Sequence, residues 1–181
     1  MIIIDDFAPL KLHYDLVDLI CDTQFNWTYT PNTYGDYMYN LPQSDVTEKE
    51  QFVHLLYKSQ PNIVSNLFTL VRPLMYFVPF EYKDIDRMKV NLLCRDSSYP
   101  ANHHHTPHMD APMDDKRHKT LLYYLDSSDG DTVFFDYDGV ETGRVSPKAN
   151  RAVIFDSKIS HASTSPRISQ TRMVINTVFV C

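Results

Sequence analysis

The spacing of hydrophobic residues changes near residue 80. Before that point it is mostly helical, and a helix is predicted over 10–20 from residues that recur every three or four positions: Leu12, Leu16, Leu19 and Ile20. A short strand is predicted at 2–5. Residues 26–40 hold Trp27 and four tyrosines among Asn, Thr and Pro, a composition typical of a loop or irregular hairpin.

Two further helices are predicted in the first half of the chain. Thr47 and Glu50 match a capping box, in which a hydroxyl and a carboxylate three residues apart cap the first turn of a helix. The helix that they open has apolar residues at helical spacing and ends at a proline: Phe52, Leu55, Leu56 and Pro61. The next helix is predicted over 62–77.

From residue 88 onward the pattern favours short strands separated by turn signals about every ten residues. They are predicted at 88–94, 119–125, 132–137, 143–145, 151–155, 160–163 and 172–180. Antiparallel strands in this number close most simply as a jelly roll, with the preceding helices packed on one sheet. We therefore predict a single domain over 1–181 of α+β class. A helical support over about 1–80 would precede a double-stranded β-helix core over about 81–181.

Composition and charge exclude several classes of partner. The chain is 43% hydrophobic and 22% charged, as folded proteins are, and its formal net charge of −6 disfavours binding to a phosphate backbone. No stretch approaches the roughly 20 apolar residues of a membrane span, and the first residues lack the basic region of a signal peptide. The three cysteines have no paired spacing, which favours a reducing compartment. We expect a cytoplasmic protein that binds neither nucleic acid nor membrane.

His108 and Asp110 are the first candidates for chemistry. Residues two apart on an extended chain point to the same side, so one metal ion could take both side chains. A third ligand from another strand, for which His161 is the natural candidate, would complete the two-histidine, one-carboxylate face that binds non-haem Fe(II) and leaves positions open. We expect the same three residues to form the catalytic centre.

The triplet alone is weak, because with eight histidines such a pattern should arise about once by chance. A second one, His13-Tyr14-Asp15, lies on the first predicted helix, where residues two apart diverge, and is interpreted as surface decoration. His108 and Asp110 gain weight from the ordered strands, His161 and Arg172 that follow them.

Arg172 lies on the last predicted strand, which contains no acidic residue. A buried guanidinium needs an anion, and a ligand carboxylate held by its planar fork would provide one. An ordinary ion pair with one of the aspartates is the alternative.

The C-terminal half resembles the prolyl 4-hydroxylase-related branch of the 2-oxoglutarate and iron(II)-dependent oxygenases. The stretch from His108-Met109-Asp110 to Tyr123-Tyr124-Leu125-Asp126 is similar to the same stretch of the hypoxia-inducible-factor prolyl hydroxylases. Asp129-Gly130-Asp131-Thr132 resembles the family's Gly-Gly-Glu-Thr turn. The strand at 145–155, followed by Ser160-His161, and the opening Ile3-Ile4-Asp5-Asp6-Phe7 also resemble family segments.

The resemblance implies a dioxygenase that couples oxidative decarboxylation of 2-oxoglutarate to succinate with hydroxylation of a C–H bond. His108, Asp110 and His161 would bind Fe(II), Arg172 would bind the distal carboxylate of 2-oxoglutarate, and Tyr124 would donate its hydroxyl to that carboxylate. O2 would be the second cosubstrate, and ascorbate is a candidate supporting reductant. The substrate would be a prolyl residue or a related group on a peptide, protein or small molecule.

The chain departs from the family pattern in two places. Asp129 replaces the first turn glycine, and the strand before His108 has Asn91 near the place where relatives often carry an aromatic residue. Asn91 is a candidate contact of the cosubstrate, although a strand residue that caps a backbone group is an equal alternative. Asn176, on the face of the last strand that carries Arg172, is a further candidate for lining the pocket.

Three alternatives stay open. His103-His104-His105 next to His108 could take part in a zinc site, although a solvated polar loop is favoured there. The tyrosines of 26–40 could form a lid or pack at an edge, and the acidic residues up to Asp115, apart from Asp110, are taken as solvated. The competing function is a non-catalytic jelly-roll module that binds a metal or ligand, because a fold alone does not fix an activity.

Overall fold

The computed structural model describes residues 1–33, 49–111 and 117–181. Its elements are β1 (Ile2–Ile4), α1 (Leu10–Cys21), β2 (Thr28–Thr30), β3 (Gln51–Lys58), β4 (Ile63–Val64), α2 (Phe68–Val71), the 3-10 helix η1 (Arg72–Phe77), β5 (Asp84–Cys94), β6 (His118–Tyr124), β7 (Thr132–Phe135), β8 (Glu141–Val145), β9 (Arg151–Asp156), β10 (His161–Ser163) and β11 (Thr171–Val180). Among them, no helix has the length and apolar character needed to cross a bilayer.

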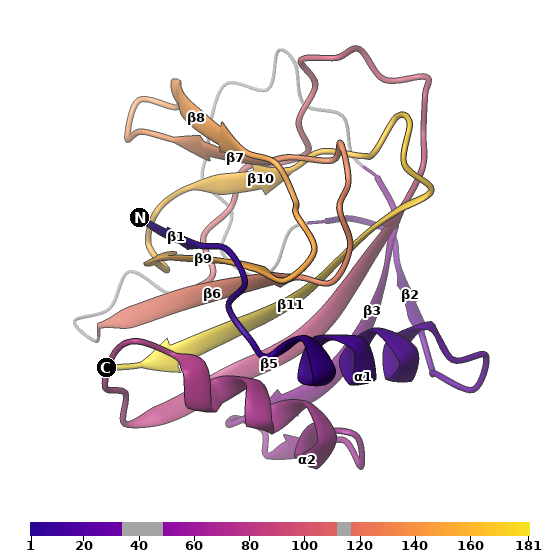
Figure 1. Ribbon diagram of the computed structural model, residues 1–181. Coiled ribbons are helices and arrows are strands. Elements are labelled where there is room, and N and C mark those ends of the chain that lie inside the picture. The colour runs from indigo at the N-terminus through magenta and orange to yellow at the C-terminus, as the bar shows by residue number, and fades with distance from the viewer. Residues whose placement is uncertain (34–48, 112–116) are drawn as a thin grey trace.

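The strands form two antiparallel sheets that face each other (Figure 1). The large sheet has the order β1-β9-β6-β11-β5-β3-β2, with β4 beside β3, and the small sheet has the order β10-β7-β8. The helices lie against the face of the large sheet that points away from the small one. This arrangement confirms the predicted α+β fold, in which helices cover one sheet of a double-stranded β-helix.

Hydrophobic side chains fill both interlayer spaces. The larger cluster joins α1 and η1 to the large sheet and includes Leu16, Ile20 and Leu74, each at most 1% exposed. A smaller cluster lies between the two sheets and includes Tyr124 and Phe134. Because the smaller cluster does not fill the whole space between the sheets, polar side chains of the inner faces can meet there.

The strand predictions for the C-terminal half are confirmed. Each predicted segment overlaps an observed strand, from β5 through β11, and the ends differ by a few residues. The first helix and the first strand are also where the sequence places them. The prediction of a single domain stays a prediction.

The helix predicted from Glu50 to Pro61 is wrong, since β3 occupies Gln51–Lys58. A register shift between Leu55 and Tyr57 in the pairing with β5 inserts one extra residue. This bulge breaks the two-residue alternation and spaces the apolar side chains as a helix would. The proposed cap residue Thr47 lies outside the described residues.

The helix predicted over 62–77 is only partly correct. Its first residues form β4, and the rest divides into α2 and η1. Pro73 stands at the start of η1, where the missing N–H of proline is tolerated. The predicted helical support over about 1–80 therefore contains strands β1 to β4 beside its helices.

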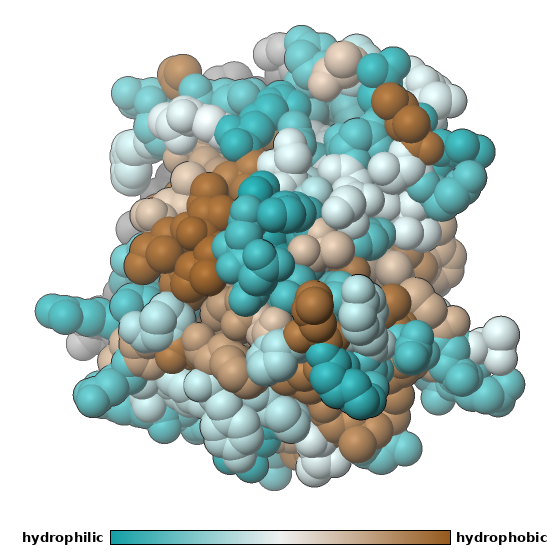
Figure 2. All heavy atoms as spheres, viewed as in Figure 1, coloured by the Kyte–Doolittle hydropathy of each residue, from teal (hydrophilic) through white to brown (hydrophobic). Residues whose placement is uncertain are grey.

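Strand β1 is the edge of the large sheet and is held by polar contacts more than by burial. Figure 2 shows hydrophobic side chains gathered over this strand, where Ile2 and Ile3 are 53% and 47% exposed. Antiparallel pairing joins β1 to β9. Asp5, just after β1, binds Arg151 and Lys148, with Oδ1 2.6 Å from Arg151 Nε.

Candidate functional site

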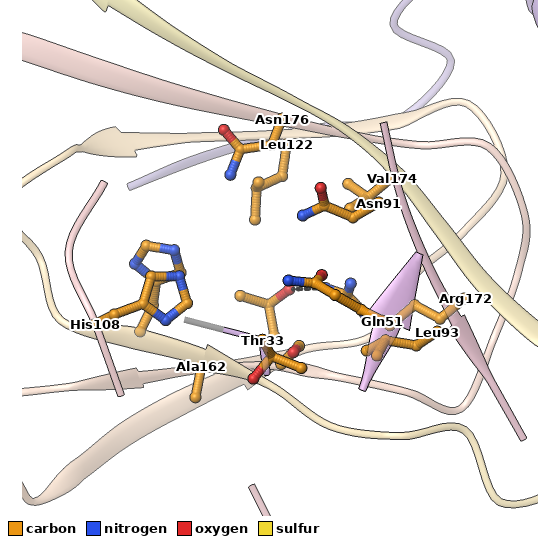
Figure 3. Close-up of a pocket in the computed structure, with 13 residues that line it drawn as sticks. Thr33, Gln51, Asn91, Leu93, His108, Leu122, Ala162, Arg172, Val174 and Asn176 are labelled. Atoms are coloured by element: carbon orange, nitrogen blue, oxygen red, sulfur yellow. Dashed lines mark hydrogen bonds between the residues drawn. The ribbon is translucent and has the colours of Figure 1, made fainter. Parts of the chain in front are cut away.

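The inner faces of the two sheets enclose a pocket. The alternation of β11 places Arg172, Val174 and Asn176 along its wall, and β5 adds Asn91 and Leu93. The pocket has an empty volume of about 380 Å³, which includes its open mouth. Figure 3 shows His108 and Arg172 at its opposite ends. A ligand in this pocket would therefore touch both.

His108, Asp110 and His161 come together at one end of the pocket. One ligand atom of each lies within 4.8 Å of the others, and all three residues are buried. His108 and His161 are joined by two backbone hydrogen bonds of 2.9 Å, each residue donating its N–H to the carbonyl of the other. The backbone itself thus sets the two imidazoles side by side.

Both histidines are oriented by backbone carbonyls. His108 Nδ1 lies 3.2 Å from the Thr106 carbonyl and His161 Nδ1 lies 3.0 Å from the Ile159 carbonyl. Because a carbonyl only accepts, each Nδ1 donates, and in the neutral ring Nε2 keeps its lone pair for a metal. Burial lowers the pKa of His108 to about 3, so this ring is neutral at physiological pH.

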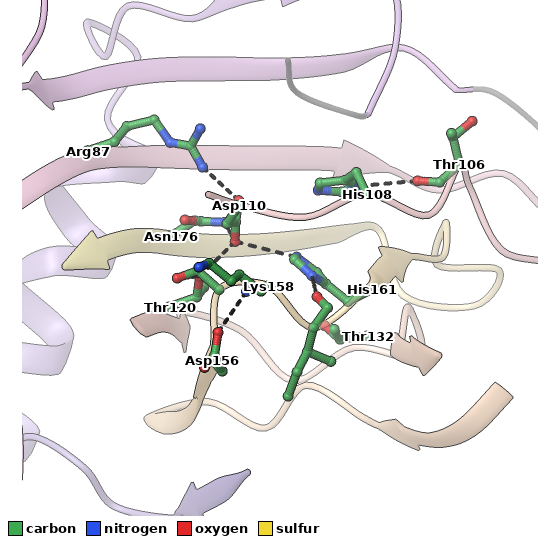
Figure 4. A network of polar contacts seen from close by, with 12 residues as sticks. Arg87, Thr106, His108, Asp110, Thr120, Thr132, Asp156, Lys158, His161 and Asn176 are labelled. Atoms are coloured by element: carbon green, nitrogen blue, oxygen red, sulfur yellow. Dashed lines mark hydrogen bonds and ion pairs between the residues drawn. The ribbon is translucent and has the colours of Figure 1, made fainter. Parts of the chain in front are cut away.

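The Asp110 carboxylate is held by donors from three neighbouring strands (Figure 4). Arg87 Nη2 lies 2.6 Å from Oδ1, Thr120 Oγ1 lies 3.0 Å from Oδ2, and Asn176 Nδ2 lies 3.1 Å from Oδ2. Burial alone would raise the pKa of Asp110, but contact with His161 and the charge of Arg87 outweigh it and hold the pKa well below its usual range. The carboxylate is therefore ionised.

These donors fit a divalent transition metal. Two imidazole nitrogens and one carboxylate oxygen form the donor set of non-haem Fe(II) sites. His161 Nε2 and Asp110 Oδ2 lie 3.4 Å apart, and two lone pairs at that distance repel unless a cation lies between them. The sequence prediction that these residues meet is confirmed by the geometry. Their role as ligands stays a prediction.

Arg172 is buried at the other end of the pocket, with 4% of its surface exposed. Its Nε donates to the Gly130 carbonyl at 2.8 Å, and its Nη2 donates to Thr132 Oγ1 at 2.7 Å. Among the residues that the structure describes, no carboxylate forms an ion pair with it. A guanidinium has five N–H groups, so several are left for a ligand anion.

Tyr124 lies behind the pocket wall. Its hydroxyl is 2.7 Å from Thr132 Oγ1, the atom that also accepts from Arg172. Thr132 lines the pocket and Tyr124 does not. Burial raises the pKa of Tyr124, which keeps the phenol protonated. In this arrangement Tyr124 acts on the pocket through Thr132, and direct donation to a ligand stays a prediction.

Several polar atoms of the pocket wall have no partner. Asn91 Oδ1, Asn176 Oδ1 and Thr33 Oγ1 are buried and make no hydrogen bond, although all three residues line the pocket. Buried polar atoms without partners are costly, and a bound ligand could satisfy them. Asn91 and Asn176 are therefore placed where the sequence expects them.

Asp129 and Gly130 shape the turn beside Arg172. The Asp129 carboxylate accepts from the backbone N–H groups of Arg167, Ile168 and Ser169. Burial opposes its ionisation, but these bonds prevail and lower the pKa to about 2. A Cβ on Gly130 would lie 2.9 Å from the Thr164 carbonyl oxygen. The departure at Asp129 thus caps the loop before β11, and Gly130 permits close approach to Arg172.

The interpretation of residues 103–105 as a solvated loop is wrong. His103 and His105 are 3% and 0% exposed. His103 Nε2 accepts from the Ser165 N–H at 2.9 Å, and His105 Nε2 lies 3.1 Å from Ser165 Oγ. These histidines pack the loop before His108 onto the segment after β10. Within the described residues, the metal-ligand cluster contains none of them.

The His13-Tyr14-Asp15 triplet lies on α1, as predicted, and does not form a chelate. Its interpretation as surface decoration is wrong for His13, which is 5% exposed. His13 Nδ1 lies 2.8 Å from the hydroxyl of Tyr123, which donates to Asn150 Oδ1 at 2.9 Å. Asp15 pairs with Lys11 at the surface. This histidine fastens the helix to the sheet.

The predicted lid and acidic cluster can be traced only in part. Tyr29 lies on β2, is 60% exposed and contacts Phe52 edge to face. The other tyrosines, Tyr34, Tyr37 and Tyr39, lie outside the described residues, as do Asp114 and Asp115.

Sequence reasoning missed Arg87, Thr120 and Thr132. The first two bind Asp110 and the third links Arg172 to Tyr124. Each lies on a predicted strand at a position two or four residues from another inward residue, which is the only signal that the sequence offers.

Comparisons with known proteins agree on a family for the core. Residues 95–180 match the family model described as 2OG-Fe(II) oxygenase superfamily. No curated protein sequence matches the chain.

Solved structures extend the likeness to nearly the whole chain. A Pseudomonas putida prolyl-4-hydroxylase is 18% identical with a TM-score of 0.58, over 99% of this chain and 91% of that chain. A prolyl hydroxylase from Trichoplax adhaerens, solved with a hypoxia inducible factor oxygen degradation domain peptide fragment, is 14% identical with a TM-score of 0.60, over 99% and 82%. The non-heme alpha ketoglutarate dependent epimerase SnoN is 10% identical with a TM-score of 0.60, over 99% and 77%. At these identities the likeness concerns the fold, and an epimerase shares it.

Proposed function

The chain belongs, through residues 95–180, to the 2OG-Fe(II) oxygenase superfamily, and on this premise we propose that it hydroxylates a prolyl residue or a related substrate. The family uses Fe(II), 2-oxoglutarate and O2. One observation carries the proposal: a single pocket has a His-Asp-His cluster at one end and a buried arginine without a carboxylate partner, among the described residues, at the other.

His108, Asp110 and His161 are the proposed ligands of Fe(II). Iron bound there, with 2-oxoglutarate and O2, supplies the oxidant that hydroxylates a C–H bond while 2-oxoglutarate becomes succinate and CO2. The protein holds the imidazoles in the tautomer that ligation needs and keeps the carboxylate ionised. The burial of all three residues limits access of bulk water.

Arg172 is the proposed partner of the distal carboxylate of 2-oxoglutarate. Burial lowers the pKa of Arg172, which shows that the charged guanidinium is desolvated, and a carboxylate ligand would offset that cost. Thr132 and the Gly130 carbonyl hold the guanidinium in place, with Tyr124 behind them. Asn91, with its unpartnered oxygen, is a proposed second contact of the cosubstrate.

The prolyl substrate is proposed from the neighbours of known activity. Three of them are named as prolyl hydroxylases, including a collagen prolyl hydroxylase of Paramecium Bursaria Chlorella virus-1 that is 13% identical, with a TM-score of 0.54 over 99% of this chain and 88% of that chain. The Trichoplax adhaerens protein was solved with a peptide. A peptide or protein that presents proline at the pocket mouth is therefore the first substrate to test.

A cytoplasmic location is proposed on the cysteines. Cys21, Cys94 and Cys181 are free thiols, and Cys21 and Cys94 are exposed. Exposed free thiols suit a reducing compartment.

A non-catalytic binding module is the less favoured function. A site that had lost its chemistry would keep no reason to retain all three candidate ligands together with Arg172. These residues are present and grouped about one pocket.

The test is cosubstrate turnover. Purified protein is incubated with Fe(II), ascorbate, 2-oxoglutarate and proline-containing peptides, and succinate and the mass gain of one oxygen atom are measured. The matched variants are Asp110→Ala and Asp15→Ala, which change the same residue type in the two His-x-Asp triplets. We expect turnover in the wild type and Asp15→Ala and none in Asp110→Ala. Succinate formation that is indifferent to Asp110→Ala would contradict the proposal.

A further inference from the structure

We propose that Arg87 is a positioning residue of the metal site, which binds one oxygen of Asp110 so that the other oxygen faces the metal. The inference rests on the proposed function, because it takes Asp110 as a ligand. Neither the family match nor the sequence motifs include Arg87, which lies before the matched residues 95–180.

The two oxygens of Asp110 have different surroundings. Oδ1 lies 2.6 Å from Arg87 Nη2, the shortest of the contacts to this carboxylate. Oδ2 lies 3.4 Å from His161 Nε2 and accepts from the Thr120 hydroxyl at 3.0 Å. The charge-assisted bond therefore occupies Oδ1 and leaves Oδ2 on the side of the histidines (Figure 4).

The sheet fixes this arrangement. Val178 of β11 pairs with Arg87 of β5 on one side and with Thr120 of β6 on the other. Directly opposed residues of antiparallel strands share one face, so Arg87 and Thr120 flank Asp110 from adjacent strands. Asn176, two residues before Val178 on the same face, reaches the carboxylate between them. Three neighbouring strands thus determine how the carboxylate is turned.

Arg87 acts on the ligand and does not reach the substrate space. It does not line the pocket that extends from His108 to Arg172. Its side chain is 16% exposed and that of Asp110 is 2% exposed, so the pair is largely shielded from water. Within the described part of the chain, Arg87 is the only Lys or Arg that pairs with Asp110. Without it, both carboxylate oxygens are free to turn toward the metal.

Two roles predict opposite signs for the loss of Arg87. If its positive charge mattered only by repelling a cation, removal would strengthen metal binding. If it orients Asp110, removal weakens binding, since groups that orient a ligand typically contribute about 10- to 100-fold in metal affinity. The second outcome is the one that the geometry supports.

The experiment measures metal binding without turnover. Apo-protein is titrated with Mn(II), free Mn(II) is followed by its electron paramagnetic resonance signal, and the Co(II)-loaded proteins are compared by their d–d absorption bands. The variants are Arg87→Gln, Arg87→Lys, Asp110→Ala and the control Arg151→Gln. Arg151 also forms a short arginine–aspartate pair, with Asp5 at the outer edge of the sheet.

We expect Arg87→Gln to weaken Mn(II) binding by about 10- to 100-fold and to shift the Co(II) bands. Arg87→Lys should recover part of both, and Arg151→Gln should match the wild type. An Arg87→Gln affinity within twofold of the wild type, or tighter, overturns the inference. If Arg87→Gln does not fold, an Arg87→Lys variant with unchanged affinity and bands overturns it equally. Wild-type binding that survives in Asp110→Ala would instead refute the proposed ligand set, and the inference with it.

Discussion

Replacing Arg172 with Gln should abolish the recognition of the distal carboxylate of 2-oxoglutarate. The change removes a buried guanidinium whose bonds to Gly130 and Thr132 hold it at the end of the pocket. Glutamine keeps a polar group but loses the charge and the forked N–H groups. Truncating one partner of a buried, hydrogen-bonded charge pair costs about 2–5 kcal/mol. This corresponds to a rise of about 30- to 5,000-fold in the Kd for 2-oxoglutarate.

The assay is equilibrium binding of 2-oxoglutarate to the Mn(II)-loaded protein in the absence of O2. A matched ligand, 2-oxopentanoate, has the same carbon chain without the distal carboxylate. The wild type should prefer 2-oxoglutarate by the same factor that Arg172→Gln loses, and the variant should bind the two ligands almost equally. Arg144→Gln, which breaks a partly exposed pair with Glu141, serves as the control for loss of an arginine.

The reasoning is refuted if Arg172→Gln binds 2-oxoglutarate within threefold of the wild type while its thermal unfolding stays normal. It is refuted equally if the variant loses affinity for both ligands to the same extent. The second result would assign Arg172 to the support of the pocket wall.

Two further predictions concern the turn beside Arg172 and the buried histidines. Gly130→Ala would place a Cβ 3.0 Å from Arg172 Cδ, and overpacking of about 1–3 kcal/mol should raise the 2-oxoglutarate Kd by about 5- to 150-fold. Gly143→Ala, which meets nothing within 4 Å, is its control, and equal affinities in both variants would contradict the prediction. Burial lowers the pKa of His103, so the unfolded chain binds its proton first. The free energy of unfolding should therefore be fully present above about pH 6.5 and fall below it by up to about 1.4 kcal/mol per pH unit. Urea unfolding of wild type and His103→Gln from pH 7.5 to 5 measures this, and an equal or steeper decline in the variant would count against it.

The sequence predicted the C-terminal strands because their alternation is regular and turn residues separate them. It failed at β3, where the bulge between Leu55 and Tyr57 changes the alternation. The pattern of a strand with a bulge and the pattern of a short helix differ by one residue, so local spacing cannot separate them. The pairing of β3 with β2 and β5 decides, and these pairings join distant parts of the chain.

The candidate site was predictable where ligand chemistry restricts residue types. His108, Asp110, His161 and Arg172 stand out because imidazole, carboxylate and buried guanidinium have few other uses on inner strands. Arg87 and Thr120 could not be identified in this way, since their role depends on which strands flank β11. His103 and His105 were misjudged for the same reason, because their partner Ser165 is 60 or more residues away along the chain.

The backbone hydrogen bonds between His108 and His161 have a consequence for how the centre is assembled. They fix the spacing of two ligands through the peptide chain, so little conformational entropy remains to be lost when a metal enters. The centre is then a rigid receptor, and one divalent ion can be exchanged for another without rebuilding the fold. Selection among metals would rest on the supply in the cell and on donor type more than on adaptation of the protein.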